Sequence, residues 1–221
     1  MGLKKIIGFD FDGSIIRSVA SEAAHFEWFE TLAVLLDDEN VKALAGQKDY
    51  FPEVYRLMER YTGLSQKDAS DKEVMTKIAR NLYQLATLGC ANKHKKNLLF
   101  KDVAELILEL KKTHTIALIT TVPGDIVLPI LRLIDFDKLD IVQTTPITEK
   151  PDKLKALERF VKENGKPILY VGNSIDDITA CKKLGIKSVL AMWGGYDKDA
   201  VQKADFTAKN ADELRKILKD L

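Results

Sequence analysis

Cysteine is scarce in this chain, which holds only Cys90 and Cys181 among its 221 residues. The two lie far apart, without a nearby cysteine or histidine at the spacing of a metal site, so we expect neither a disulfide scaffold nor a zinc site. Long apolar runs are missing too. No segment approaches the roughly 18 apolar residues of a membrane span, and the short run behind the N-terminal lysines does not read as a signal peptide. A cytoplasmic protein without a membrane partner is therefore expected.

An excess of charge of either sign is also lacking. Lysine and arginine number 34, against 33 aspartate and glutamate residues. The densest basic segment, "NKHKKN" at 92–97, contains no aromatic residue, which favours a solvated loop over a nucleic-acid site. Apolar residues make up 46% and charged residues 30% of the chain, as in globular proteins. The length suits one large domain, or a core domain that carries an insertion.

The chain changes its pattern near residue 99. Beyond it, short apolar runs alternate with amphipathic helical segments, which is typical of a parallel sheet buried on both faces. With the run before Asp10, this pattern predicts a five-stranded, Rossmann-like α/β core formed by residues 1–17 and 96–221. Residues 18–95 show helical patterns and no convincing strand, and they predict an inserted helical domain. The later apolar runs lie at 115–121, 140–145, 167–173 and 187–193.

Two carboxylates follow the first apolar run, in "KKIIGFDFDGSII" at 4–16. Residues i and i+2 of a strand point to the same side, so Asp10 and Asp12 would lie close together and each would raise the cost of ionising the other. Either a solvated turn separates them, or a cation or a reaction uses them. Polar residues also follow the other predicted strands, among them Thr120, Thr144 and Asn173. Since ligands bind beyond the carboxyl ends of parallel strands, these residues predict a functional site there.

Four segments, in this order, resemble the motifs of the haloacid dehalogenase-like hydrolase superfamily. They are "DFDGS" (10–14), "IALIT" ending in Thr120, "EKPDK" with Lys150, and "GNSIDD" (172–177). The likeness is to the phosphatase branch with a helical cap after the first strand, the branch of phosphoglycolate phosphatase and beta-phosphoglucomutase, and it covers essentially the whole chain. It implies an α/β core with residues 18–95 as the cap.

The resemblance also implies chemical roles. Asp10 is expected to be the nucleophile that forms an aspartyl-phosphate, and Asp12 the acid and base that serves the leaving alcohol and then water. Thr120 and Lys150 are expected to contact the phosphoryl group and to complete the catalytic set. Magnesium, a hard cation that prefers oxygen ligands, is the implied cofactor. Its expected ligands are Asp10, Asp12, Asn173 and Asp177.

Substrate contacts are expected near the first two motifs and in the cap. Gly13 lets the chain turn sharply after the nucleophile strand. His25, in "HFEWF", either takes part in the site or packs within its helix. In the turn "AGQKDYF" (45–51), Gln47 or Lys48 either selects the substrate or is simply exposed. The expected substrate-binding residues are Gly13, Ser14, Thr121, His25, Gln47 and Lys48, and the partner is a small phosphorylated metabolite.

Two positions depart from the family pattern. Asn173 stands where relatives usually carry an acidic metal ligand, and Arg17 where many carry an acid. Asp176 is expected only to favour the start of a helix. A magnesium-dependent phosphatase is the leading interpretation. A metal-independent haloacid dehalogenase, a phosphomutase and a catalytically silent phosphate-binding protein remain alternatives, and both a monomer and a homodimer are open.

Overall fold

The structure is a computed structural model that describes residues 4–46, 51–146 and 149–220. It divides into two compact units. One, the sheet unit, comprises Met1–Ser18 and Lys95–Leu221, and the other, the helical unit, comprises Val19–His94. The sequence predicts this insertion over 18–95, one residue longer at each end than the helical unit. A role of the helical unit as a cap over the site stays a prediction.

The sheet unit contains a six-stranded sheet in the order β3-β2-β1-β4-β5-β6. All of its strand pairs are parallel, which confirms the predicted Rossmann-like α/β class. Five strands were predicted, and the sixth was missed because β6 is a three-residue strand in a polar segment. The strands are β1 (Ile6–Phe9), β2 (Thr115–Ile119), β3 (Ile141–Gln143), β4 (Leu169–Gly172), β5 (Lys187–Ala191) and β6 (Phe206–Ala208).

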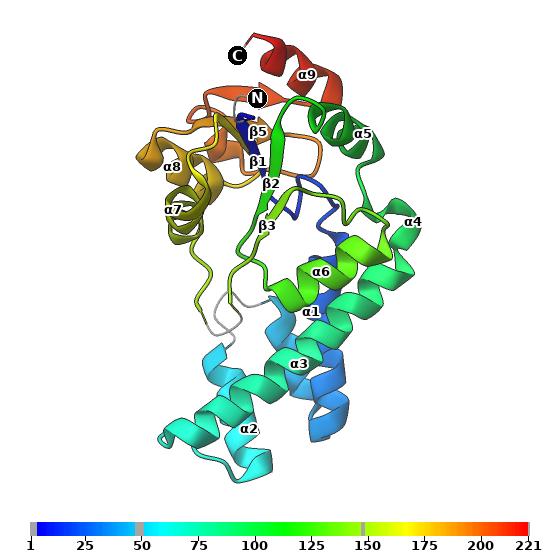
Figure 1. Cartoon of the computed structure of the whole chain (residues 1–221). Helices are drawn as coiled ribbons and strands as arrows, with labels where there is room; N and C mark the ends of the chain where they lie inside the picture. The colour runs from blue at the N-terminus through cyan, green and yellow to red at the C-terminus, as the bar shows by residue number, and fades with distance from the viewer. Residues whose placement is uncertain (1–3, 47–50, 147–148, 221) are drawn as a thin grey trace. The chain divides into compact units, whose positions relative to one another are not determined.

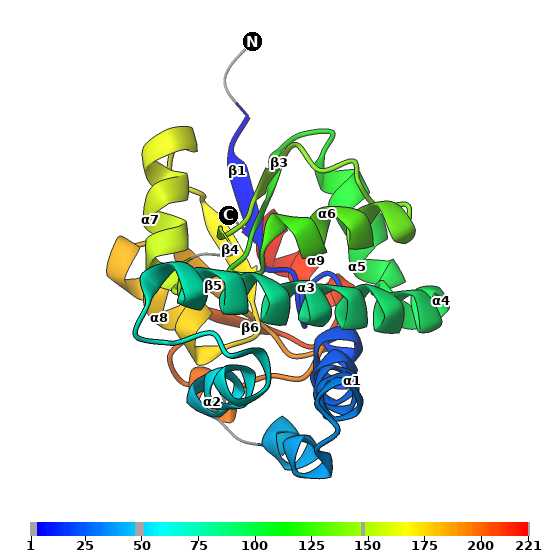
Figure 2. The same ribbon diagram turned by 90° about the horizontal axis from the view of Figure 1, so that it is seen from below.

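Helices cover both faces of this sheet (Figures 1 and 2). Helices α7 and α8 lie on one face, and α5, α6 and α9 on the other. Strands β1 and β4 have four residues each, and all of these residues except Ile6 are buried. Side chains on both faces of these strands are therefore covered by helices. The helices are α4 (Lys95–Leu98), α5 (Lys101–Leu110), α6 (Gly124–Leu133), α7 (Lys153–Asn164), α8 (Ile175–Leu184) and α9 (Ala211–Lys219), with the 3₁₀ turn η2 (Lys198–Ala200).

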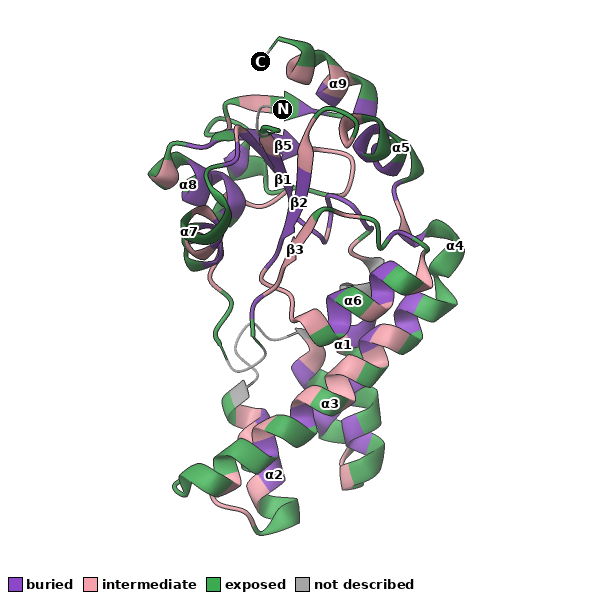
Figure 3. Cartoon of the chain, in the orientation of Figure 1, coloured by how far each residue is buried: buried purple, intermediate pink, exposed green. Residues whose placement is uncertain are grey.

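The helical unit has its own apolar core, visible as buried segments in Figure 3. Its helices are α1 (Val19–Leu36), the 3₁₀ segment η1 (Glu39–Gly46), α2 (Phe51–Thr62) and α3 (Ala69–Lys93). Asp68 caps α3, because its side chain accepts hydrogen bonds from the backbone N–H groups of Ser70 and Asp71. Among the described residues, no helix has the length and apolar character needed to cross a lipid bilayer.

The strand order decides where a ligand can bind. The chain moves outward from β1 to β2 and β3, and then returns to β4 on the other side of β1. The topological switch point therefore lies between β1 and β4, where Phe9 is aligned with Val171. The segments that follow these two strands carry the first and the fourth predicted motif. The fold thus places both motifs at the same carboxyl edge of the sheet.

Candidate active site

Asp10 directly follows β1, and its backbone continues the pairing with β4. Its N–H donates to the Val171 carbonyl at 2.8 Å, and the residue is only 8% exposed. Asp12 is half-buried. Between Asp12 and the buried Ser14, Gly13 takes a φ of 70°, a conformation that favours glycine. The turn "DFDGS" thus aims a buried carboxylate and a more exposed one at the edge of the sheet.

Lys153 is the lysine that the structure brings to Asp10. Its Nζ lies 2.6 Å from Asp10 Oδ1 and 2.9 Å from Asp177 Oδ1. Lys150, the lysine predicted from the sequence, is exposed and precedes α7, so this expectation was wrong. The sequence held a signal for the correct residue. Lys153 is followed at i+3, i+4 and i+7 by the buried residues Ala156, Leu157 and Phe160, which places it on the buried face of α7.

Burial sets the protonation of this cluster. Burial raises the pKa of Asp10 to about 6, against the opposing charge of Lys153, and the Asp177 carboxylate raises it further. Burial by itself would lower the pKa of Lys153, but the charges of Asp10 and Asp177 outweigh it and raise this pKa well above its usual range. The ammonium is therefore held in its charged form, and Asp10 is largely ionised at neutral pH.

Tyr170, on β4, is a further member of the cluster, and one that sequence reasoning missed. It is fully buried, and its hydroxyl lies 3.0 Å from Lys153 Nζ. Burial raises the pKa of the phenol well above its usual range, so the hydroxyl keeps its proton. In the sequence, Tyr170 is part of the apolar run "ILYVG", and nothing there distinguishes it from a core aromatic. The cluster formed by Asp10, Lys153, Tyr170 and Asp177 is called the lysine cluster below.

A pocket of about 180 Å³ opens beside the lysine cluster. The second predicted motif contributes directly, since Thr120 and Thr121 both belong to its wall. Thr120 Oγ1 accepts the N–H of Val122 at 3.1 Å, so its own hydrogen can be donated to a ligand. The lining residues are Asp10, Asp12, Thr120, Thr121, Val122, Pro151, Lys153, Ser174 and Asp176.

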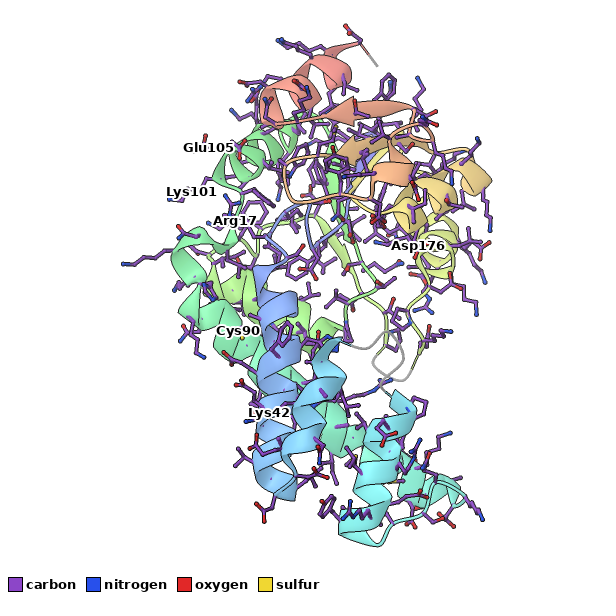
Figure 4. The ribbon with its side chains drawn as sticks, turned by 180° about the vertical axis from the view of Figure 1, so that it is seen from behind. Arg17, Lys42, Cys90, Lys101, Glu105 and Asp176 are labelled. Carbon is purple, nitrogen blue, oxygen red and sulfur yellow. The ribbon has the colours of Figure 1, made fainter. Side chains whose placement is uncertain are left out.

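The fourth motif is arranged differently from the prediction. Asp177 is fully buried, and its Oδ2 accepts hydrogen bonds from the Ser174 hydroxyl and from the backbone N–H groups of Asn173 and Ser174. With Oδ1 paired to Lys153, neither oxygen of Asp177 faces the pocket as a metal ligand, which corrects that expectation. Its neighbour Asp176, labelled on the first turn of α8 in Figure 4, is exposed and lines the pocket.

Asn173, also expected at the metal, is engaged with the segment after β5. Its Nδ2 donates to the Gly195 carbonyl at 2.9 Å, and its carbonyl accepts the N–H of Asp197 at 3.1 Å. The lining residues described for the pocket do not include Asn173. The side chain also packs directly against Gly13, where any side chain would collide with it. The amide thus joins two turns beside the pocket, a contact that spacing in the sequence does not reveal.

The other residues predicted to contact the substrate lie in different places in the structure. Ser14 is wrong as a contact, since it is completely buried and its carbonyl accepts the indole N–H of Trp193 at 3.0 Å. Gly13 shapes the turn but does not line the pocket. His25 belongs to the helical unit, where its ring packs against Phe29 at 5.6 Å between centroids and burial lowers its pKa. Gln47 and Lys48 lie outside the described residues.

Arg17, the second departure, has a structural partner. Its guanidinium lies over the Phe100 ring, 4.6 Å from the centroid, and its Nε donates to the Asn97 carbonyl at 2.9 Å. Figure 4 shows it near the start of α5. The residue that replaces an acid here therefore fastens the start of the helical insertion to its end within the sheet unit.

The oxygen donors of the pocket fit a magnesium ion that keeps water ligands. Within residues 4–46, 51–146 and 149–220, no three histidine, cysteine, aspartate or glutamate side chains are arranged to enclose one ion. Magnesium, however, is commonly held by one or two carboxylates, with water and substrate phosphate completing its shell. Asp10 and Asp12 share the pocket, with Asp176 also in its lining. These hard oxygen donors match that chemistry.

Comparison with known proteins shows the family and the fold of this chain. The family model of haloacid dehalogenase-like hydrolases matches residues 4–185. No curated protein matches the chain. Among solved structures, a haloacid dehalogenase-like family protein from Streptococcus pneumoniae is 18% identical, with coverage of 97% of this chain and 98% of that one, and a TM-score of 0.67. A predicted phosphatase from Clostridium acetobutylicum is 15% identical over 100% of both chains, with a TM-score of 0.68.

A predicted phosphoglycolate phosphatase from Haemophilus somnus is 18% identical, covers 99% of both chains and gives a TM-score of 0.65. At such identities the solved structures establish the fold alone. The family model, by contrast, spans the first strand, the helical insertion, and the segments that carry all four motifs. This chain belongs to the haloacid dehalogenase-like hydrolases, and it is an enzyme of that family.

Proposed function

We propose that the protein is a magnesium-dependent phosphatase that hydrolyses a small phosphate monoester through an aspartyl-phosphate on Asp10. The observation that carries this proposal is the ion pair of Asp10 with Lys153, at 2.6 Å, in the wall of a pocket that also holds Asp12. A buried carboxylate fixed by a cation can attack phosphorus while its orientation is preserved. The pocket volume of about 180 Å³ suits a phosphoryl group with a small substituent.

The residues divide the reaction into two steps. Asp10 attacks the phosphorus atom, the bond to the ester oxygen breaks, and Asp12 gives its proton to the departing alkoxide. Asp12, now ionised, takes a proton from water, which attacks the aspartyl-phosphate and releases inorganic phosphate and free Asp10. Thr120 can donate its hydroxyl hydrogen to a phosphoryl oxygen, since that hydroxyl already accepts the Val122 N–H.

Magnesium supplies positive charge that offsets the repulsion between the Asp10 carboxylate and the phosphate. In this chain Asp10 and Asp12 are proposed to hold it, with Asp176 as the additional acid of the pocket. Lys153 is directed mainly at protein oxygens, so its proposed role is to hold Asp10 in place and to neutralise it.

The test is hydrolysis of an aryl phosphate with and without magnesium. We expect turnover with magnesium, its loss on chelation, and its return when magnesium is restored. Acid-quenched enzyme should carry phosphate on Asp10, and Asp10→Asn should abolish both the adduct and turnover. Asp12→Asn should impair alkyl phosphates more than nitrophenyl phosphate, because only the poor leaving group needs a proton. Full activity in excess chelator would refute the magnesium dependence, and release of halide from a haloacid would refute the proposal in favour of a dehalogenase.

A further inference from the structure

Lys153 is surrounded by more acceptors than it has hydrogens. Asp10 Oδ1 lies at 2.6 Å from Nζ, Asp177 Oδ1 at 2.9 Å, Tyr170 Oη at 3.0 Å and the Ile119 carbonyl oxygen at 3.4 Å. An ammonium carries three N–H donors. Its orientation, and hence its distance to Asp10, therefore depends on which of these acceptors it uses.

The hydroxyl of Tyr170 is polarised in one direction. Its oxygen lies 2.7 Å from the Ile119 carbonyl oxygen, which can only accept, so the phenol hydrogen is committed to that bond. A lone pair of the phenol oxygen is then left to face the ammonium of Lys153. The same bond occupies the Ile119 carbonyl, which would otherwise be a competing acceptor for the lysine.

The ring of Tyr170 occupies space that its neighbour across the sheet leaves open. Gly8 on β1 is aligned with Tyr170 on β4. A Cβ atom at position 8 would come within 2.6 Å of Tyr170 Cδ2 and 3.3 Å of Ile119 Cδ1. Glycine at position 8 therefore leaves the room that the tyrosine ring occupies.

We propose that Tyr170 is a positioning residue for the reaction, which fixes the Lys153 ammonium against Asp10. The inference rests on the proposed function, since it assigns a partner to the lysine of that site. Without the hydroxyl, the Ile119 carbonyl loses its donor and becomes the nearest replacement acceptor. The ammonium then shifts toward Ile119, and Asp10 is held less firmly for its attack on phosphorus.

Tyr170→Phe removes the hydroxyl and keeps the ring. We expect kcat for an aryl phosphate to fall about tenfold with KM unchanged, because a hydrogen bond to a charged group contributes free energy of that order. Tyr55→Phe is the matched control. It also removes a phenol hydroxyl, which here lies 2.6 Å from Thr76 Oγ1 in the helical unit, and it should leave kcat unchanged.

A second variant displaces the ring and keeps the hydroxyl. Gly8→Ala introduces the Cβ atom that collides with Tyr170, and it should lower kcat in the same way as Tyr170→Phe. Circular dichroism establishes that each variant is folded. If Gly8→Ala does not fold, Tyr170→Phe and its control still decide the question.

The position of the lysine can also be measured without turnover. In protein labelled with ¹⁵N-lysine, the ammonium signal absent from Lys153→Met identifies Lys153, and its hydrogen exchange with water reports how firmly it is held. We expect slow exchange in the wild type, faster exchange in Tyr170→Phe and no change in Tyr55→Phe. Unchanged exchange, or faster exchange without a loss of kcat, would overturn the inference. A wild type that hydrolyses no phosphate ester would instead refute the proposed function, while the exchange still shows whether Tyr170 holds the lysine.

Discussion

Two buried clusters of this protein are built from opposite materials. The core of the helical unit is apolar and includes Trp28, Phe29 and Met75, each at most 2% exposed. The lysine cluster at the carboxyl edge of the sheet is buried almost as deeply, with Lys153 at 8% and Asp177 at 0% exposed, yet it consists of ionisable groups. One region removes hydrocarbon from water, and the other removes charge.

The two kinds of burial have opposite effects on stability. Burying apolar surface stabilises the fold by about 25 cal/mol for each Å². Burying an ion pair gains little or costs stability, since desolvation competes with attraction. The pKa of Asp10, raised by burial to about 6, shows that its ionised form is disfavoured in the folded chain. A cluster of this kind is understandable in a hydrolase if it prepares a nucleophile, which is the role proposed for Asp10.

The largest effect is expected when the cation of the lysine cluster is removed. Lys153→Met keeps the length of the side chain but leaves Asp10 and Asp177 without their ion-pair partner. We expect the free energy of unfolding to fall by about 3–5 kcal/mol, as when a buried pair is broken. Phosphatase activity should disappear. Urea unfolding followed by Trp193 fluorescence in a Trp28→Phe background measures the first effect.

Lys150→Met is the control for this prediction. Lys150 is an exposed lysine three positions away, so its replacement should change the free energy of unfolding by less than about 0.5 kcal/mol. Similar losses of stability and activity in the two variants would mean that the lysine cluster is not organised around Lys153.

The next largest loss of stability is expected from truncating a side chain in the apolar core of the helical unit. Met75 is completely buried in the helical unit, and Met75→Ala should cost about 2–5 kcal/mol of unfolding free energy through lost burial and the cavity that remains. Trp28, in the same cluster, reports this transition in a Trp193→Phe background. Val74→Ala, at a neighbouring position that is 42% exposed, should have a much smaller effect. Equal effects would contradict the assignment of Met75 to a packed core.

The comparison also shows what the sequence could predict. Apolar runs located β1, β2, β4 and β5, because strands buried on both faces leave a pattern of continuous hydrophobicity. The positions of Asp10 and Thr120 at the pocket follow from the same runs, since both residues come directly after a strand. Such a pattern does not reveal β6, because this strand has three residues and only Ala208 among them is buried.

Side-chain direction was harder to predict than position. Lys150 and Lys153 both flank Pro151, and a motif match cannot choose between them, whereas the helical phase of α7 does. Asp176 and Asp177 are adjacent, yet one lines the pocket and the other is buried. The capping box between Ser174 and Asp177 decides this, and its spacing was present in the sequence.

An intermediate effect, of opposite sign, is expected for Asp10→Asn. Burial raises the pKa of this carboxyl from its ordinary value of 3.8 to about 6 in the folded chain, so its ionisation opposes folding. In metal-free protein at pH 7.5, the amide should raise the free energy of unfolding by about 3 kcal/mol. Below about pH 4, Asp10 of the wild type is protonated in both the folded and the unfolded chain. The difference in unfolding free energy between variant and wild type should therefore disappear as pH falls from about 6 to 4. Urea titrations at several pH values measure this difference. If Asp10→Asn is less stable than the wild type at pH 7.5, the attraction between Asp10 and Lys153 outweighs the cost of desolvating the carboxylate.

The smallest effect on stability is expected at Asn173, whose side chain contributes a neutral hydrogen bond beside the lysine cluster. Asn173→Asp exchanges the amide that donates to the Gly195 carbonyl for a carboxylate that cannot donate. Without magnesium we expect a loss of about 1 kcal/mol, the contribution of one hydrogen bond, with a further loss from the negative charge placed near the Asp177 carboxylate. Asn173→Ala loses the bond without gaining charge, so the difference between the two variants isolates the electrostatic part. If the new carboxylate reaches the ion, adding magnesium should raise the Tm of Asn173→Asp by more than it raises the Tm of the wild type or of Asn173→Ala. An equal rise in all three proteins would place residue 173 beyond the reach of the metal, in the role of fastening the turn at Gly195 to the turn at Gly13.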